Sequence, residues 1–585
     1  MSFKKFFVPN LLIVLILAGL RLSGIDPVVK SDNDDSTNLT KYVQAQRNIV
    51  ANYYGDADID KMYKASIRRM VKSLKDTTLQ ISESPIDTSF SGVTVNSSKD
   101  SFTKFEQAYL YVSNNRPDEN MDKLTEAAIR GMFSTLDPHS MYIEAKDNEQ
   151  IQDEFAGKFQ GIGVQFNIMQ DTITVITAIS GGPSDMLGIR SGDRIIEIED
   201  TSAVGYTNEM VVRRLRGEKG SQVKVTVKRP GVEQPISFTI TRDDIPLYTV
   251  DAAYLLDENT GYIKINRFAA TTHDEFMQAM SDLKSDGMDR LVLDLRRNPG
   301  GYLSQAIAMA EEFFPRGTEL VSTKSKHSRF DGEYFSRKDG SFKDKPVIVL
   351  VDEGAASASE IVSGAIQDHD RGLIVGKRTF GKGLVQQQYE LVDNSSVRVT
   401  ISRYYTPSGR LIQKPFTEGN EDYAYEIYER HNAADDAGEF IDDIPDSLKY
   451  STAAGRTVYG GGGIVPDFIV PEDTSTSAFV INFALSKRAS FDYVREYLDE
   501  NGDEFRAKWK DDFQYFRENF KWDQDNVREF RKTLENKGMV ITDTVDTPSF
   551  KKDSLFIPPG HFEEVSWLTE GRMKAELARQ VWGME

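Results

Sequence analysis

The sequence contains no cysteine, only six histidines, and many more acidic than basic residues among its 585 positions. The absence of cysteine excludes disulfide bonds, thiolate catalysis and a lipid-modified N-terminal cysteine. The formal net charge of −20 argues against non-specific binding of nucleic acid, which needs basic patches to contact the phosphates. With 28% charged and 39% hydrophobic residues, the composition is that of a globular chain, and the length predicts three or four domains.

The first 24 residues predict a targeting signal. Lys4 and Lys5 form a basic start, and Leu11–Leu20 is an apolar stretch of signal-peptide length that is short for a membrane span. Because residues 21–24 offer no small-x-small cleavage site, a cleaved signal peptide and a retained membrane anchor both stay open. Either alternative predicts an exported protein, periplasmic or anchored to the inner membrane facing the periplasm. The polar residues 31–37 predict a linker.

Residues 25–150 predict a helical region with an internal repeat. The pattern at residues 60–74 recurs at residues 122–136, and its apolar members fall at helical spacing. Two related amphipathic helices explain this repeat, because two copies are too few for a solenoid. The second copy continues into His139, to which we assign a structural role.

The stretch from Lys345 to Arg410 carries the candidate chemistry. Residues 347–351 predict a buried strand, and Ser357 to Glu360 have the spacing of a helix N-cap. A serine between a strand and a helix start exposes its hydroxyl at a corner, beside free backbone N–H groups. A second strand is predicted at residues 372–376, before Lys382, which lies between two glycines.

A serine hydroxyl needs a base to take its proton, and none of the six histidines lies in a motif typical of a catalytic triad. Lys382 can serve instead if burial keeps its amine neutral. Local spacing alone also permits a surface serine and a solvated lysine. A phosphate-binding loop at Gly376–Lys382 is excluded, because Gly383 replaces the required Ser or Thr and residues 384–391 predict a strand, not a helix.

Two motifs in this stretch resemble the carboxyl-terminal processing peptidases, also called tail-specific proteases. Gly354–Ala365 resembles the nucleophile segment of that family, and Thr379–Gln386 resembles its lysine segment. The resemblance implies a Ser–Lys dyad of Ser357 and Lys382, with Gln386 holding the lysine. It also implies a crotonase-like mixed α/β core, and no metal or other cofactor is expected.

The oxyanion hole implied by the resemblance comes from two backbone segments. Residues 291–295 predict a buried strand that ends in a turn containing Gly300 and Gly301. In the resembled family this glycine turn supplies one backbone N–H, and the second is expected from Ala358. Glycine suits the first position because the backbone must approach the scissile carbonyl closely.

Residues 151–242 resemble a PDZ domain, a module that binds protein C-termini. Three elements carry the likeness: a glycine loop at 160–164, the segment 183–196, and a turn after Arg216 that leads into a strand. Backbone N–H groups of such a loop hold a terminal carboxylate while the peptide adds a strand to the sheet edge. The expected peptide-binding residues are Gly161, Ile162, Gly163 and Val164. Arg216 is a candidate for regulation, and a purely structural PDZ domain is the alternative.

The remaining chain predicts an acidic, exposed insertion at residues 414–450 and helices beyond residue 472. Five aromatic residues of the last region form one apolar stripe at helical spacing, which predicts a packing face, with a docking face for a partner or a second copy as the alternative. They are Phe505, Trp509, Phe513, Phe516 and Phe520.

Together these observations predict an α+β multidomain protein: a crotonase-like mixed α/β serine-protease core, a PDZ domain, and helical N- and C-terminal regions. The expected units are residues 1–24 (signal or anchor), 25–150 (helical), 151–242 (PDZ), 243–470 (peptidase core) and 471–585 (helical). The expected function is an exported serine endopeptidase that recognises C-terminal tails and cleaves through an acyl-enzyme. A PDZ tail-binding or chaperone module with an inactive or closed protease site is the alternative. Expected partners are proteins or peptides with exposed C-terminal tails, with membrane association through the N-terminus, a homodimer and an adaptor protein left open.

Overall fold

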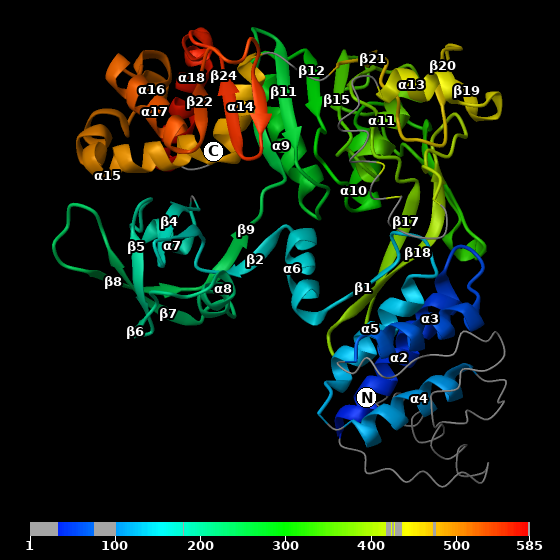
Figure 1. Ribbon diagram of the computed structural model, residues 1–585. Helices are drawn as coiled ribbons and strands as arrows, with labels where there is room; N and C mark the ends of the chain where they lie inside the picture. Colours follow the sequence, from blue (N-terminus) through cyan, green and yellow to red (C-terminus); the bar gives the residue numbers. More distant parts are fainter. Residues whose placement is uncertain are drawn as a thin grey trace, which may run out of the picture.

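A computed structural model describes residues 33–74, 101–116, 118–179, 181–416, 423, 426, 436–471 and 476–582. Figure 1 shows four parts: the N-terminal helices in blue, a β-rich unit in teal, a mixed core in green and yellow, and a C-terminal region in orange and red. The predicted targeting signal lies outside the described residues. Within the described residues, no helix has both the length and the apolar character needed to cross a membrane.

The N-terminal part is a helical bundle whose sequence repeat is a packed helix pair. Its helices are α2 (Asn33–Asn52), α3 (Ile59–Lys72), α4 (Ser101–Asn115) and α5 (Met121–Phe133). The repeated helices α3 and α5 carry matching N-caps, Asp58 and Asn120, each accepting a backbone N–H three residues on at 3.0 Å. They meet at Gly131, where an added Cβ would lie 2.7 Å from the Cα of Ser66. The predicted linker at 31–37 is wrong from residue 33 on, because α2 begins there and its Asp35 accepts hydrogen bonds from Tyr109 and Ser113 of α4.

The β-rich unit contains a six-stranded antiparallel sheet, a separate pair of antiparallel strands and two short helices. It follows β1 (Met141–Ile143) and α6 (Ala145–Ala156). Its elements are β2 (Lys158–Gly161), β3 (Val164–Met169), β4 (Thr172–Ala178), α7 (Pro183–Met186), β5 (Arg194–Ile198), β6 (Thr201–Ser202), α8 (Asn208–Leu215), β7 (Gln222–Lys228), β8 (Ile236–Thr241) and β9 (Asp243–Pro246). The strand order β3-β4-β5-β7-β8 leaves β3 at an edge, while β2 pairs with β9. Inward-facing isoleucines and valines at period two form its core.

The core of the molecule is a six-stranded sheet of order β10-β11-β12-β15-β16-β21, parallel except for β10. Its strands are β10 (Val250–Leu255), β11 (Thr260–Ile265), β12 (Arg290–Asp294), β15 (Val347–Val351), β16 (Leu373–Gly376) and β21 (Phe468–Ile469). Helices α9 (Thr272–Ser285), α10 (Leu303–Glu311) and α11 (Ala358–Asp368) bury one large apolar cluster against these strands. In open sheets of parallel strands, ligands bind beyond the carboxyl ends of the strands. In this core, β12 and β15 end on that side of the sheet.

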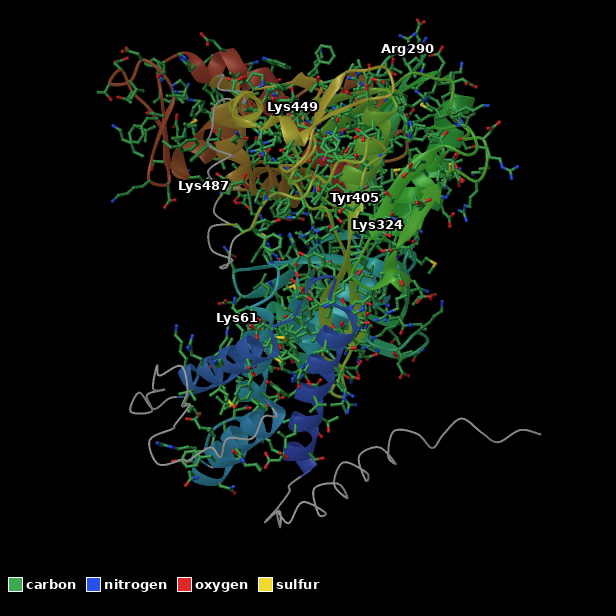
Figure 2. All side chains as sticks on the ribbon, turned by 90° about the vertical axis from the view of Figure 1, so that its right-hand side faces the viewer. Lys61, Arg290, Lys324, Tyr405, Lys449 and Lys487 are labelled. Carbon is green, nitrogen blue, oxygen red and sulfur yellow. The ribbon has the colours of Figure 1, made fainter. Side chains whose placement is uncertain are left out.

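A second sheet joins the core to the N-terminal helices. It contains β1, β13 (Glu319–Lys324), β14 (Gly332–Phe335), β17 (Leu384–Glu390) and β18 (Ser396–Tyr405), and a short helix η1 (Ser328–Phe330) connects β13 to β14. In Figure 2, Lys324 and Tyr405 mark the last residues of β13 and β18, at the two ends of the short antiparallel ladder between these strands. The far end of the β17–β18 hairpin buries Val397 and Val399 among the N-terminal helices, and the buried Lys41 reaches Asp393 at its turn over 2.7 Å.

The stretch after β18 contains α13 (Asp436–Asp443), η2 (Asp446–Leu448), β19 (Lys449–Ser451) and β20 (Thr457–Tyr459). The predicted exposure of residues 414–450 is wrong at Lys414 and Tyr423, which are 4% and 8% exposed. Their burial has a physical reason: the Lys414 amine lies over the Tyr423 ring, 4.0 Å from its centroid, and pairs with Glu426 at 2.6 Å.

The C-terminal region is mostly helical, as predicted, but it also contains a small sheet. Its helices are α14 (Thr476–Ser486), α15 (Ala489–Trp509), α16 (Phe513–Asn519), α17 (Gln524–Asn536) and α18 (His561–Trp582), with strands β22 (Met539–Ile541), β23 (Ser549–Lys551) and β24 (Ser554–Ile557) between them. The aromatic stripe is divided between α15 and α16. Four of its members are buried in one cluster, which confirms the packing face, whereas Phe513 is 42% exposed.

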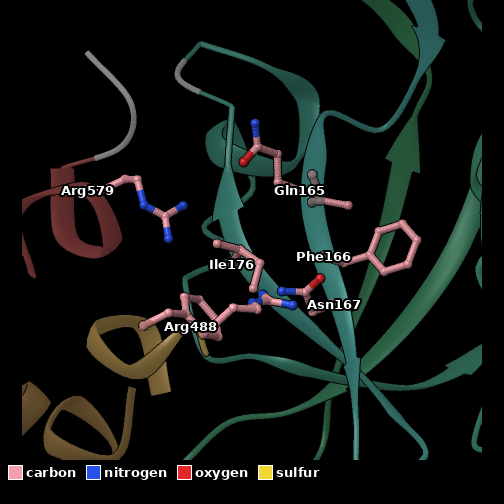
Figure 3. A pocket seen from close by; sticks show the side chains of 8 residues that line it. Gln165, Phe166, Asn167, Ile176, Arg488 and Arg579 are labelled. Atoms are coloured by element: carbon pink, nitrogen blue, oxygen red, sulfur yellow. The ribbon is translucent and has the colours of Figure 1, made fainter. Parts of the chain in front are cut away.

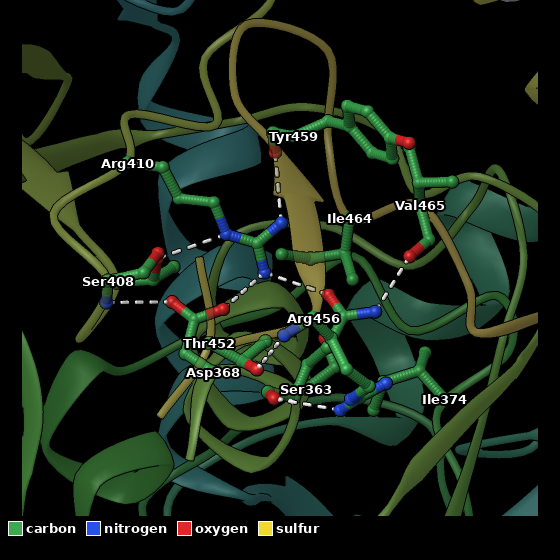
Figure 4. Close-up of polar contacts among 12 residues, drawn as sticks. Ser363, Asp368, Ile374, Ser408, Arg410, Thr452, Arg456, Tyr459, Ile464 and Val465 are labelled. Atoms are coloured by element: carbon green, nitrogen blue, oxygen red, sulfur yellow. Dashed lines mark hydrogen bonds and ion pairs between the residues drawn. The ribbon is translucent and has the colours of Figure 1, made fainter. Parts of the chain in front are cut away.

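Arg410 anchors the C-terminal end of α11 in the core. Its side chain is fully buried and pairs with the equally buried Asp368 at 2.6 Å (Figure 4). It also donates to Gln367 Oε1 at 2.8 Å, to the Tyr459 carbonyl at 2.9 Å and to Thr406 Oγ1 at 3.3 Å. Asp368 also accepts the Ser408 N–H at 3.0 Å. The pair therefore fixes the loops after β18 and after β20 against α11.

We expect Arg410→Met to lower the free energy of unfolding by about 3–5 kcal/mol, because Asp368 would remain buried without its cation. Urea unfolding measures this loss. The double variant Arg410→Met/Asp368→Leu should recover a large part of it, since an apolar pair leaves no buried charge. A loss below about 1 kcal/mol in the single variant would contradict this account of the pair.

Candidate active site

Ser357 occupies the corner between β15 and α11, in a strained backbone conformation. It is the N-cap of α11, with φ 55° and ψ −109°, a region that residues other than glycine rarely adopt. Its side chain is partly exposed, whereas Ala356 and Ala358 on either side are buried. The predicted N-cap is therefore confirmed, and the turn holds the serine hydroxyl at the surface of an otherwise buried segment.

Glu360 joins the backbones of Ser357 and Lys382. One oxygen of its fully buried carboxylate, Oε2, accepts the N–H of Ser357 at 2.7 Å and the N–H of Lys382 at 2.9 Å. The other oxygen, Oε1, accepts the Thr379 hydroxyl at 2.5 Å and the Gly381 N–H at 2.7 Å. Burial raises the pKa of Glu360, and these hydrogen bonds oppose that rise. The carboxylate thus brings the serine and lysine segments together.

Tyr404 joins the same two residues through their carbonyl groups. Its hydroxyl contacts the carbonyl oxygens of Ser357 at 3.1 Å and of Lys382 at 2.7 Å, and its ring is fully buried. Burial raises the pKa of Tyr404 well above its ordinary value, so the hydroxyl keeps its proton. Ser357 and Lys382 are therefore held at both their N–H and C=O groups, although 25 positions separate them in the sequence.

The side chain of Lys382 lies in an environment that disfavours its charge. Burial lowers the pKa of Lys382 to about 8, and the nearby Arg398 adds to the decrease, while Asp137 and Glu360 oppose it. The amine donates a hydrogen bond to Gln386 Oε1 at 2.8 Å. Among the hydrogen bonds of the described residues, none joins Lys382 Nζ to Ser357 Oγ in this conformation.

His139 lies beside this lysine, but its position indicates support and not proton transfer. Its backbone carbonyl accepts the amide of Gln386, and its ring Nε2 lies 2.8 Å from the Tyr423 hydroxyl. Burial, together with the positive charges of Lys382 and Lys414, lowers the pKa of His139 to about 3. The imidazole is therefore neutral near pH 7, in keeping with the structural role assigned from the sequence.

The glycine turn after β12 faces the serine corner. A Cβ added to Gly300 would lie 2.8 Å from the Ser357 Cβ and 2.9 Å from the Ala358 nitrogen, so only glycine fits there. The Gly300 N–H donates to Asn298 Oδ1 at 2.9 Å and is engaged in this conformation. Among the backbone hydrogen bonds of the described residues, none uses the N–H of Gly301 or of Ala358 as its donor. Ala358 opens α11, where a helix leaves its N–H groups free.

Several residues of this site were missed in the sequence. Glu360 was recognised only as part of a helix start, and Tyr404 carried no assigned role. Asn298 also went unnoticed, although its carbonyl accepts the Ala356 N–H at 3.0 Å and the Ser359 hydroxyl at 2.9 Å. The one available sign was the position of Glu360 three residues after Ser357, typical of a capping box.

The expected peptide-binding residues lie between β2 and β3 in the β-rich unit. Gly161 ends β2, Ile162 is buried, Gly163 has φ 74°, and Val164 begins β3. The Ile162 carbonyl accepts both the N–H and the hydroxyl of Ser184, at 3.1 and 2.6 Å. The loop is thereby pinned to the start of α7, at the end of the edge strand β3.

Arg216 contacts the helix that precedes the β-rich unit. It pairs with Asp153 of α6 and lies over the Phe159 ring, 4.7 Å from its centroid. At the end of α6, the Phe155 ring lies 4.9 Å from the ring of Tyr302, the residue after Gly301. Contacts thus run from Arg216 through α6 to the glycine turn.

No group of three or more His, Asp or Glu side chains suited to hold a metal ion occurs among the residues that the structure describes.

Comparison with known families gives two matches along the chain. A model described as peptidase family S41 matches residues 259–421, and a PDZ-domain model matches residues 160–240. The first covers Ser357, Lys382 and the glycine turn, and the second covers the loop at 161–164.

Curated proteins and solved structures give related matches. The chain is 38% identical over 319 residues to a carboxy-terminal-processing protease of Bartonella bacilliformis, covering 54% of this chain and 71% of that protein. It is 35% identical over 315 residues to the carboxy-terminal processing protease CtpB of Bacillus subtilis, covering 53% and 65%. A solved photosystem II D1 C-terminal processing protease is 28% identical, with 64% of this chain and 90% of that chain covered and a TM-score of 0.34.

Proposed function

The chain belongs to the carboxy-terminal processing proteases of peptidase family S41, and we propose that it cuts polypeptides near C-terminal tails that its PDZ domain has bound. Membership confirms the predicted serine-type peptidase, the PDZ domain and the mixed α/β fold. The enzyme alternative is thereby favoured over a tail-binding or chaperone module without activity. The proposed mechanism rests on one observation: Glu360 and Tyr404 hold the backbones of Ser357 and Lys382 side by side.

In the proposed mechanism, Ser357 Oγ attacks the scissile carbonyl carbon while neutral Lys382 takes the hydroxyl proton. The C–N bond then breaks, Lys382 returns the proton to the leaving amine, and the acyl group remains on Ser357. A water molecule then gives a proton to Lys382 and attacks the acyl carbon. The bond between Ser357 Oγ and that carbon breaks, Lys382 returns the proton to Ser357 Oγ, and the new C-terminus is released. The hydrogen bond from Lys382 to Gln386 orients the amine between these steps.

The negative oxygen of the tetrahedral intermediate needs backbone donors. We assign these to the N–H groups of Ala358 and Gly301, with Gly300 providing the close approach that a side chain would block. Each donor is worth about 3 kcal/mol of transition-state stabilisation in such sites. Gly300 can donate only if its N–H leaves Asn298 Oδ1.

A resting state that opens when a tail is bound is supported by the hydrogen bonding of Lys382. Among the hydrogen bonds of the described residues, none joins its amine to the Ser357 hydroxyl, so the proton transfer requires a closer approach of the two groups. The contacts from Arg216 through Asp153 and Phe155 to Tyr302 connect the PDZ domain with the glycine turn. We therefore propose Arg216 as the residue through which tail binding reaches the active site.

The pH dependence of cleavage tests the lysine base. Because only the neutral amine accepts a proton and the pKa of Lys382 lies at about 8, kcat/KM should rise about tenfold per pH unit up to pH 8 and then level off. The rate of a fluorogenic tail peptide between pH 5.5 and 10 measures this profile. A plateau already reached at pH 6.5 would instead indicate a histidine base or an unperturbed carboxylate.

We also propose export, on the composition of residues 1–24, with the enzyme in the periplasm or anchored to the inner membrane facing it. Cell fractionation tests this location, and the mass of the mature chain decides between a cleaved signal peptide and a retained anchor. Proteins with exposed C-terminal tails are the proposed substrates. A homodimer and an adaptor protein remain the open alternatives for partners.

A further inference from the structure

An open cavity that the proposed mechanism does not use lies between the C-terminal region and the PDZ domain. Its volume is about 360 Å³, and it lies between strands β3 and β4 on one side and helices α15 and α18 on the other (Figure 3). The lining residues are Val164, Gln165, Phe166, Asn167, Ile176, Arg488, Phe491 and Arg579.

Strand β3 presents two different faces to its surroundings. Val164 and Phe166 pack against the apolar core of the PDZ domain, whereas side chains alternate along a strand, so Gln165 and Asn167 belong to the opposite face. Arg488 and Arg579 approach from the C-terminal helices on the left of Figure 3, and Gln165 and Asn167 lie on the strand that they approach. Of the residues of β3 that line the cavity, Gln165 and Asn167 therefore supply its polar groups.

The side chains of a tail bound along β3 would alternate between the same two faces. β3 stands at the edge of its sheet among the described strands, directly after the loop that we propose holds the terminal carboxylate. A tail paired with this edge points every second side chain toward the apolar side. The side chains in between, at the second and fourth positions from the C-terminus, point to the face of Gln165 and Asn167, next to the cavity.

The cavity carries positive charge although the chain as a whole has a formal net charge of −20. Its lining contains two arginines and no carboxylate. The two guanidinium groups lie over the ring of Phe491, at 5.0 Å for Arg488 and 5.8 Å for Arg579, which limits their freedom. Arg579 also pairs with Glu576 at 2.5 Å, whereas no ion pair of Arg488 occurs among the described residues.

We propose that Arg488 and Arg579 form a second recognition site for substrate tails, selecting an acidic side chain at the second or fourth position from the C-terminus. The substrate class is then a tail with an apolar terminal residue and alternating acidic positions. This inference rests on the proposed capture of C-terminal tails by the PDZ domain, because the loop sets which side chains face the arginines.

Binding of labelled ten-residue peptides to the full chain carrying Ser357→Ala tests the inference. The peptides share one apolar terminal residue and differ only in having Glu, Gln or Lys at the second and fourth positions from the end. In 50 mM salt, fluorescence anisotropy should show the Glu peptide binding about three- to tenfold more tightly than the Gln peptide, and the Lys peptide more weakly than both. Salt at 500 mM should remove most of the difference.

Charge reversal supplies the decisive comparison. Arg488→Glu should abolish or invert the preference for the Glu peptide while leaving the affinity of the Gln peptide unchanged. The unchanged affinity of the Gln peptide would also show that the PDZ domain of the variant is folded. Arg572→Glu, on the exposed surface of α18 and outside the cavity, is the matched control and should keep the preference. An unchanged Glu preference in Arg488→Glu overturns the inference.

A peptide with an amidated C-terminus separates this inference from the function on which it rests. If the amidated and free Gln peptides bind equally, tail capture through the terminal carboxylate is wrong, and the second site falls with it. If binding requires the free carboxylate but the Glu, Gln and Lys peptides bind equally tightly, tail capture stands and only the proposed arginine site is wrong.

Discussion

Ser357→Ala should lower kcat/KM for an unstructured-tail substrate by about 10,000-fold or more, because no other atom of the site can form the acyl-enzyme. The strained turn at position 357 should stay in place, because alanine retains the Cβ and the backbone N–H that donates a hydrogen bond to Glu360. Quantifying intact substrate and products by mass spectrometry over hours measures the residual rate.

Two controls accompany this variant. Ser359→Ala removes a buried hydroxyl two residues away that bonds to the Asn298 carbonyl, so it should reduce stability while leaving most of the activity. Tail binding by the Ser357→Ala protein should equal that of the parent. Cleavage by Ser357→Ala at even one tenth of the parent rate would mean that another residue is the nucleophile.

Lys382→Met should lower kcat/KM by about 100- to 10,000-fold, the range in which a positioned general base contributes. Methionine has a similar length, carries no basic nitrogen and tolerates the buried site, so the loss reports the missing amine and not a collapsed pocket. The Lys382 N–H and C=O groups that contact Glu360 and Tyr404 remain.

The form of the loss distinguishes a base from a merely structural lysine. A missing base should lower kcat with little change in KM and should flatten the rise of activity below pH 8. Lys382→Arg is the matched comparison: it keeps a cation of similar reach but cannot be deprotonated near neutral pH, and it should be as inactive as Lys382→Met. Parent-like activity in Lys382→Arg would contradict the assignment.

The sequence predicted the elements that carry the site because their signals are local. The apolar run ending at Val351 became β15, and the Ser357–Glu360 spacing became the start of α11. The repeated helices and the glycine turn after β12 were predicted for the same reason: periodicity, caps and glycines are read within a few residues.

The sequence could not predict the contacts that give these elements their chemistry. Tyr404 reaches Ser357 and Lys382 only because β18 returns alongside β17, and that register is set by the fold. The lowered pKa of Lys382 depends on burial by distant segments, including the one that carries His139. The small C-terminal sheet was missed because its strands have only three or four residues each, too few for a periodic pattern.

The β17–β18 hairpin has a mechanical consequence. Lys382 stands just before one end of this paired arm, which β1 and β13 extend along the outer side of β18. The opposite end, with Val397, Val399 and Asp393, is embedded among the N-terminal helices. A paired ribbon resists bending across its hydrogen bonds, so a swing of those helices relative to the parallel sheet would tilt the arm as one body. Because Glu360 and Tyr404 tie the backbone of Lys382 to that of Ser357, such a tilt would act as a load on the hydrogen bonds that join the proton acceptor to the nucleophile.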